Sequence, residues 1–147
     1  MSLQRKGYPC VSLLIGRTTN HECTLRNATP EKLRALIRQN LDDLRAILEH
    51  NRGHGWTLFR VGSSVIPFGS HPVNGIRWWR EFGKDLREIG SAVRAEKMRL
   101  SFHPGQYTVL NSPDPGSVAR AVDEIAYSAR FLTELGLDSA NKIVIHL

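Results

Sequence analysis

Four short apolar segments alternate with three amphipathic helical patterns, and this alternation restricts the folds that the chain can adopt. A strand followed by a helix and then by another strand favours parallel pairing, because the helix carries the chain back to the end where the first strand began. We therefore expect an α/β fold with four parallel strands and three helical crossovers. The expected strands span residues 6–14, 56–61, 98–103 and 142–147.

The expected helices have clear boundary signals. The first and third begin with an N-cap residue followed by proline, at Thr29-Pro30 and Asp114-Pro115, and they end near Gly53 and Gly136. Of the adjacent Trp78-Trp79 pair in the second helix, we expect one residue in the core and one at its rim. The residues at helical spacing that we expect to face the core are Leu33, Ile37, Leu41, Leu44, Leu48, Trp79, Phe82, Leu86, Ile89, Val93, Val118, Val122, Ile125, Ala129 and Leu132.

A sheet of this kind is either doubly wound or part of a (β/α)8 barrel. No Gly-x-Gly-x-x-Gly pattern follows the first strand, which argues against a dinucleotide-binding fold. In a TIM barrel the chemistry lies at the carboxyl ends of the strands, where His103 and His146 fall. Such barrels need roughly 250 residues. We therefore interpret residues 1–147 as about half of a TIM-type barrel, with four strands and three helices.

Composition narrows the functional classes. The 41% hydrophobic and 23% charged content is that of a folded globular chain, and no apolar run reaches the roughly 18 residues of a membrane span. Residues 1–7 lack the apolar core of a signal peptide, and Cys10 and Cys23 have no metal-binding spacing. These features favour a cytoplasmic chain without a membrane partner. The net charge of +6 favours an anionic partner, of which nucleic acid is the commonest large one.

Histidines form the candidate chemical site. His103 and His146 each follow an apolar run directly, at equivalent strand ends. A single such histidine is often a core-edge residue bonded to a carbonyl group, but two equivalent ones favour a shared ligand role. Neutral imidazole suits zinc, manganese or iron. His71, which precedes Pro72 in a loop, is either a further ligand or an ordinary turn residue.

A polar and aromatic pair follows the third strand. Gln106 and Tyr107 come after the turn at Pro104-Gly105. They either fold back onto the core or act as a probe, in which the ring stacks on a base and the amide donates or accepts a hydrogen bond. Tyr8, at the start of the first strand, is either a packing residue or part of a pocket wall.

Several segments of the chain are distinctive when taken together. They are Gly7-Tyr8-Pro9-Cys10, Gly16-Arg17-Thr18-Thr19-Asn20, Leu58-Phe59-Arg60-Val61, Ile66-Pro67-Phe68-Gly69-Ser70-His71-Pro72, His103-Pro104-Gly105-Gln106-Tyr107, Asn111-Ser112-Pro113-Asp114-Pro115 and Ile143-Val144-Ile145-His146. Together these segments resemble the ultraviolet-damage DNA endonucleases. The resemblance covers essentially the whole chain, and it matches the amino-terminal half of that family.

The resemblance implies a TIM barrel that nicks DNA immediately 5′ of an ultraviolet photoproduct or an abasic site by metal-assisted hydrolysis. It implies a cluster of divalent ions, usually manganese, with zinc or magnesium as alternatives. His71, His103 and His146 match metal-site histidines of the family. Gln106 and Tyr107 match the pair that probes the lesion, and Tyr8 matches a residue of the pocket for the flipped dinucleotide.

The carboxylates of the family's metal site come from its second half, so we expect this chain to be inactive alone and assign no catalytic residue within it. Two alternatives stay open. One is another metal-dependent TIM-barrel enzyme, such as a sugar isomerase. The other is a non-catalytic half-barrel that binds damaged double-stranded DNA or associates with itself through its exposed sheet edges.

Overall fold

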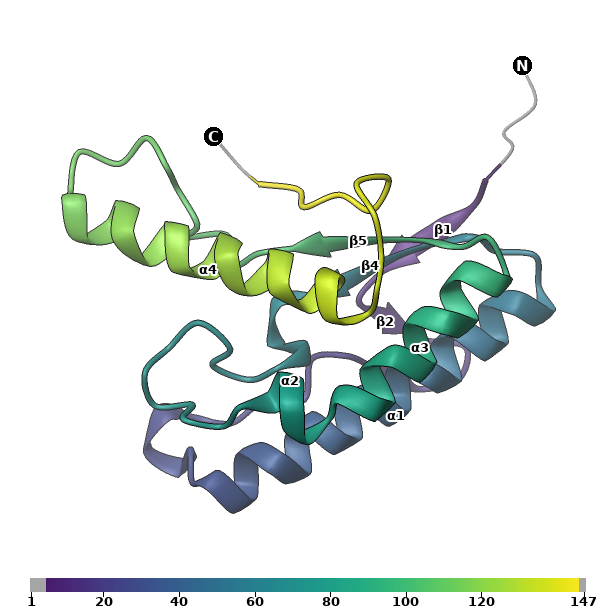
Figure 1. Ribbon diagram of the computed structural model, residues 1–147, viewed down its shortest axis with the longest axis horizontal. Coiled ribbons are helices and arrows are strands. Elements are labelled where there is room, and N and C mark those ends of the chain that lie inside the picture. Colours follow the sequence, from purple (N-terminus) through teal and green to yellow (C-terminus); the bar gives the residue numbers. More distant parts are fainter. Residues whose placement is uncertain (1–4, 146–147) are drawn as a thin grey trace.

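The computed structural model describes residues 5–145, and its main sheet has three parallel strands (Figure 1). The strands are β1 (Gly7–Pro9), β4 (Leu58–Gly62) and β5 (Arg99–His103), in the order β1-β4-β5. Both neighbouring pairs are parallel. The sheet is open within the described residues. The expected α/β class with parallel strands and helical crossovers is therefore confirmed.

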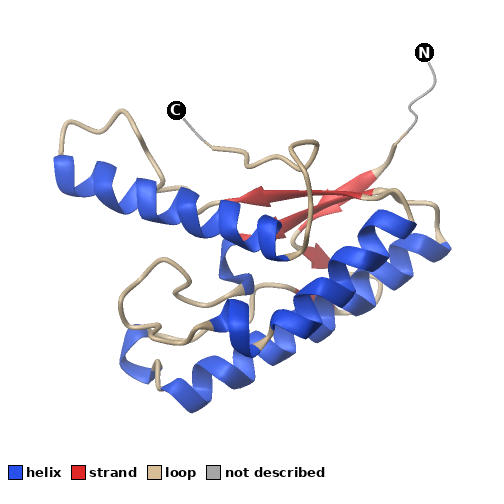
Figure 2. Ribbon diagram, viewed as in Figure 1, coloured by secondary structure: helices blue, strands red, loops and turns tan. Residues whose placement is uncertain are grey.

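The helices gather on one side of the sheet (Figure 2). They are α1 (Pro30–Gly53), α2 (Trp78–Glu81), α3 (Gly83–Ala95) and α4 (Pro115–Glu134), and two short 3₁₀ turns, η1 and η2, span Leu25–Asn27 and Ser63–Val65. The strands present alternate residues to this layer, so that Phe59, Val61, Leu100 and Phe102 are buried. The Thr29 hydroxyl accepts a hydrogen bond from the Lys32 amide, and the Asp114 carboxylate caps α4 in the same way, as the sequence predicted.

The prediction of one strand over residues 6–14 is wrong. Cys10 has a φ of 58°, a left-handed conformation that turns the chain out of the sheet. The next residues form β2 (Val11–Ser12), which pairs antiparallel with β3 (Arg17–Thr18). Leu13 and Leu14 lie at the tip of this hairpin and are 89% and 73% exposed, although the apolar pattern had placed them in the first strand.

Two buried polar residues of α1 hold this hairpin segment in place. The Asp43 carboxylate bonds to Arg17 Nη1 at 2.7 Å and to His21 Nε2 at 2.8 Å. The Asn40 amide accepts from the His21 backbone N–H at 2.8 Å and donates to the Ser64 carbonyl oxygen at 2.9 Å. These contacts join the segment to α1 and to the turn after β4.

Two helix faces differ from the prediction. Trp78 is the core residue of the tryptophan pair and Trp79 the rim residue, the reverse of the predicted stripe, and the Arg130 guanidinium lies 3.8 Å from the Trp79 ring centroid. In α4, Val122 is 52% exposed, and Ala129 is also exposed. The buried face of α4 carries Leu132, as predicted, together with Ala121, Tyr127, Ser128 and Phe131, because the two aromatic rings pack on Phe102 of β5.

Of the expected fourth strand, the described part, residues 142–145, forms a short contact with β5. Ile143 forms one parallel bridge with Phe102, supported by hydrogen bonds from the Phe102 amide to Lys142 O at 2.8 Å and from the Val144 amide to Phe102 O at 2.9 Å. The chain therefore runs beside β5 in the expected direction. Among residues 5–145, no helix has both the length and the apolar character that crossing a membrane requires.

The crossing of α3 and the end of α4 depends on a glycine. A Cβ atom added to Gly90 would lie 1.6 Å from the Leu135 carbonyl oxygen. Gly90→Ala should therefore lower the free energy of unfolding by about 1–3 kcal/mol, because the two segments must separate. Urea denaturation measures this change. The matched control is Gly53→Ala, whose Cβ atom would meet nothing within 4 Å. Equal stabilities of the two variants would contradict the prediction.

The Asp43 contacts predict a pH dependence. Burial alone would raise the pKa of Asp43, but the hydrogen bonds from His21, Arg17 and the Thr18 amide outweigh it and lower that pKa below 3.8. At a given pH, the Asp43 carboxylate therefore binds a proton more readily in the unfolded chain than in the folded chain. The stabilisation by Asp43 is present above pH 3.8 and is lost as the pH falls through the lower folded-state pKa.

Asp43→Asn should therefore be less stable than the wild type at pH 7, and the difference should shrink as the pH falls below 3.8. Urea denaturation at a series of pH values measures it. Asp123→Asn, at an exposed position of α4, is the control. A difference between Asp43→Asn and wild type that is constant with pH would argue against this role of the carboxylate.

Candidate functional site

The carboxyl ends of β4 and β5 lie side by side. Gly62 and His103, the last residues of the two strands, are paired in the parallel register. The segments that follow, residues 63–77 and 104–114, therefore leave the sheet at the same end of the strands, to which the arrows point in Figure 2. We call this end the carboxyl edge. This edge brings together the loops that carry the predicted site residues.

His103 is a half-buried residue at this edge. It follows the buried Phe102, so its side chain projects from the opposite face, away from the helices. His146 lies outside the described residues. The shared ligand role of these two histidines stays a prediction.

His71 is exposed in the loop that follows η2. Its Nδ1 atom accepts a hydrogen bond from the Val73 amide at 3.1 Å, and its ring meets the Phe68 ring edge-on at 5.9 Å between centroids. A neutral ring that accepts at Nδ1 carries its proton on Nε2, so binding a metal through Nε2 would require the Val73 contact to break. Within residues 5–145, no three His, Cys, Asp or Glu side chains are placed to hold a metal ion together.

Gln106 and Tyr107 are both exposed on the loop after β5, and Tyr107 is 85% exposed. The loop is closed by a hydrogen bond from the Thr108 amide to Gly105 O at 2.9 Å. A polar hollow lies beside Tyr107 and reaches Ser70 on the neighbouring loop. Tyr107 does not fold back onto the core, so the structure excludes the simple packing alternative for this residue.

Tyr8 lies on the face of the sheet that meets the helices. Its ring packs edge-on against Phe59 and Trp56, at 5.5 and 5.6 Å between centroids, and its hydroxyl donates to Asn51 Oδ1 at 2.6 Å. These contacts favour the packing interpretation. A role of Tyr8 in a lesion pocket stays a prediction.

Sequence reasoning missed the residues of α4 that hold the His71 loop. The buried Tyr127 hydroxyl accepts from the Ile66 amide at 3.1 Å and donates to Ser63 O at 2.9 Å. Burial raises the pKa of Tyr127 well above its ordinary value, so the hydroxyl keeps its proton. Glu124 Oε2 accepts from Ser70 Oγ at 2.5 Å. The only sequence signal was a tyrosine among the apolar residues of a helix.

Gly69 allows this loop to lie directly on the Tyr127 ring, because a Cβ atom at Gly69 would be 2.3 Å from ring atom Cε2. We name Ser63, Ile66, Gly69 and Ser70, with Tyr127 and Glu124 of α4, the loop clamp. The clamp fixes the path of the chain from the end of β4 to His71.

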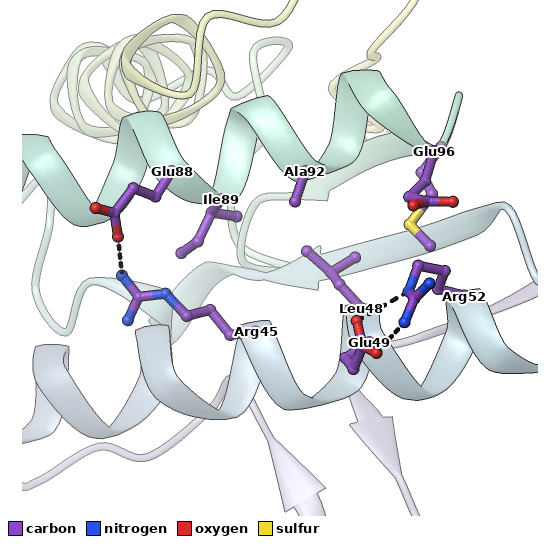
Figure 3. A pocket seen from close by; sticks show the side chains of 9 residues that line it. Arg45, Leu48, Glu49, Arg52, Glu88, Ile89, Ala92 and Glu96 are labelled. Carbon is purple, nitrogen blue, oxygen red and sulfur yellow. Dashed lines mark hydrogen bonds and ion pairs between the residues drawn. The ribbon is translucent and has the colours of Figure 1, made fainter.

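Another hollow lies between α1 and α3, away from this edge. Figure 3 shows that charged pairs border it, with Arg45 joined to Glu88 and Glu49 joined to Arg52, while Leu48 contributes to its apolar floor. None of the predicted site residues lines it. The candidate site is therefore the carboxyl edge of the sheet.

Comparison with known proteins identifies the family. The family model described as UV-endonuclease UvdE matches residues 6–147. The chain belongs to this family. It is 40% identical to the UV DNA damage endonuclease of Clostridium perfringens over 141 residues, which cover 96% of this chain and 34% of that relative. It is 32% identical to the Bacillus cereus UV DNA damage endonuclease over 117 residues, which cover 80% of this chain and 37% of that relative.

A solved UvdE-family structure agrees with the fold. The crystal structure of SacUVDE superposes with a TM-score of 0.93 at 33% identity, over 97% of this chain and 49% of that chain. The chain thus spans about a third of the length of the two curated relatives and about half of the solved chain.

The loop clamp predicts a stability difference between two tyrosines. Tyr127→Phe removes a hydroxyl that pairs with two buried backbone groups, and should lower the free energy of unfolding by about 1–3 kcal/mol. Tyr107→Phe removes a hydroxyl from an exposed ring and should leave stability unchanged. Urea denaturation of the two variants tests the contrast. A Tyr127→Phe protein as stable as wild type would show that water replaces these hydrogen bonds.

Proposed function

We propose that this chain is the amino-terminal half of a TIM-type barrel that nicks DNA 5′ of ultraviolet photoproducts or abasic sites. Membership of the UvdE family supports the proposal, as do the relatives named for UV DNA damage. The observation that carries it is the exposed Gln106-Tyr107 pair at the carboxyl edge, next to the strand end that bears His103.

Lesion recognition follows from the properties of damaged DNA. A photoproduct stacks and pairs poorly, so its extrusion from the duplex costs less than that of normal bases. An exposed aromatic ring with a neighbouring amide can then occupy the space that the extruded bases leave. Recognition depends on the deformability of the duplex rather than on its base sequence. The net charge of +6 supports contact with the phosphate backbone. This role implies a cytoplasmic location, with the DNA.

Divalent ions, manganese first and zinc or magnesium as alternatives, are the proposed cofactors. Phosphodiester hydrolysis is commonly assisted by clustered ions of this kind. His71 and His103 with His146 are the proposed imidazole ligands, but the described residues do not form a cation site by themselves. Further ligands, carboxylates above all, would have to come from outside residues 5–145.

A non-catalytic role is the second candidate for the chain by itself. The main sheet is open, and β1 has a neighbour on one side only within the described residues. Unpaired strand edges are templates for association. The chain alone would then bind damaged DNA, or pair with itself, without cleaving.

The test compares irradiated with unirradiated duplex in the presence of manganese. Two protein samples are used: the 147-residue chain alone, and the same chain co-expressed with the carboxyl-terminal remainder of the Clostridium perfringens relative. We expect the chain alone to bind irradiated duplex more tightly without cleavage, and the pair to nick 5′ of the lesion. Fluorescence anisotropy measures binding, and a denaturing gel measures nicking.

In the co-expressed pair, His103→Ala should abolish nicking and weaken manganese binding, which titration calorimetry measures. His54→Ala, at the exposed end of α1, should change neither. Equal affinity for irradiated and unirradiated duplex would contradict the repair function. Nicking that survives His103→Ala would remove the ligand role of this histidine alone.

A further inference from the structure

The Asn20 side chain lies directly on the last residue of β4. A Cβ atom added to Gly62 would be 2.0 Å from Asn20 Oδ1, 2.9 Å from Cγ and 3.0 Å from Nδ2. Position 62 can therefore carry only glycine while the amide keeps this place. The close approach explains a glycine at the end of a buried strand, where a side chain would otherwise add to the packing.

The amide lies on the same face of the sheet as the His103 ring. Gly62 and His103 are partners across the parallel pair β4 and β5. Adjacent strands lie about 4.8 Å apart, and partner residues direct their side chains to the same face. The Cβ direction of Gly62, which Asn20 occupies, is thus the direction in which His103 projects. Asn20 and His103 are neighbours at the carboxyl edge.

The backbone around Asn20 is well held. The Asn20 amide N–H donates to Thr18 Oγ1 at 3.1 Å, the Thr19 N–H donates to Cys10 O at 3.2 Å, and the His21 N–H donates to Asn40 Oδ1 at 2.8 Å. These bonds join the segment to the turn after β1 and to α1. The side chain therefore starts from a fixed point, although residue 20 is exposed.

The Asn20 side chain keeps a donor for a ligand. The Asn20 amide acts on the Cys10 thiol to lower its pKa, but burial outweighs this effect, and the pKa of the thiol stays above its ordinary value. The amide nitrogen has two N–H donors, so one remains for a ligand even where the other is directed to the sulfur. Arg60 also acts electrostatically on the Cys10 thiol, which places a positive charge near the same group. A fixed N–H donor close to a guanidinium suits an anionic oxygen.

We propose that Asn20 is a further DNA-contacting residue, which donates its amide hydrogen bond to a phosphodiester oxygen of the strand that reaches His103. This inference rests on the proposed function and adds a residue to its site. Contacts to phosphate position the duplex without reading its sequence, which suits an enzyme that recognises lesions. The Oδ1 atom, which lies closest to the strand backbone, is covered by Gly62 and is not the contacting atom.

The test measures the affinity of the 147-residue chain for an irradiated duplex by fluorescence anisotropy at several salt concentrations. Asn20→Ala should weaken binding about tenfold, the usual effect of losing one hydrogen bond to a charged group. The slope of log affinity against log salt should stay unchanged, since no cation is removed. Asn20→Asp should weaken binding further, because a carboxylate repels phosphate. Asn27→Ala, an exposed asparagine of η1, is the control and should bind like wild type.

Gly62→Ala provides an independent variant, since its methyl group displaces the amide without altering it. It should bind about as weakly as Asn20→Ala, and the double variant should be no weaker than either, because both changes remove one contact. Gly53→Ala is its control. Thermal unfolding of each variant confirms that it is folded.

The possible results distinguish a failure of the proposed function from a failure of the Asn20 inference. If the wild type shows no preference for irradiated duplex, the proposed function fails and this inference fails with it. If the wild type prefers irradiated duplex but folded Asn20→Ala binds equally well, only the inference is overturned. Tighter manganese binding by Asn20→Asp, with DNA affinity retained, would also overturn it, by showing a position suited to a metal ligand.

Discussion

The parallel pairing of β4 with β5 is the constraint on which the arrangement of the candidate site depends. Its register aligns Leu58 with Arg99 and Gly62 with His103, so both strands end together. Two loops that are far apart in the sequence therefore start from one edge. A shift of one residue would turn His103 toward the helices and Phe102 away from them. The burial of Phe102 among the aromatic rings of α4 opposes that shift.

Polar side chains inside the helix layer hold the neighbouring loop segments in place. Asn40 and Asp43 of α1 hold the segment around His21, and Tyr127 of α4 holds the loop after β4. Asn40 and Tyr127 bond to backbone groups, and the contacts of Asp43 with Arg17 and His21 pair a buried carboxylate; buried polar groups of this kind are costly to leave unpaired. The positions of the site loops are thus determined by helices that contribute no residue to the predicted metal site.

The sequence predicted the features that depend on local pattern. The caps at Thr29 and Asp114, the end of the third predicted strand at residue 103, and the parallel class all follow from spacing and turn chemistry, while β4 ends at Gly62, one residue later than predicted. The sequence-based prediction failed where a single backbone angle or a single tertiary contact determines the local structure. Nothing local at Cys10 indicates a left-handed turn, and the Gly62 contact of Asn20 joins residues that the sequence separates by 42 positions.

The two faces of the sheet differ in polarity, and the face away from the helices is more polar than the usual interior of a TIM barrel. The interior of a TIM barrel is usually filled by branched apolar side chains. Here the face away from the helices carries Leu58, Arg60, Arg99 and Ser101, which line a hollow, and His103, whereas all the large buried residues of the strands face the helices. The core is therefore formed between the sheet and its helices, and folding of the described residues does not need apolar contacts across a closed barrel. The opposite face carries most of the polar side chains of the strands.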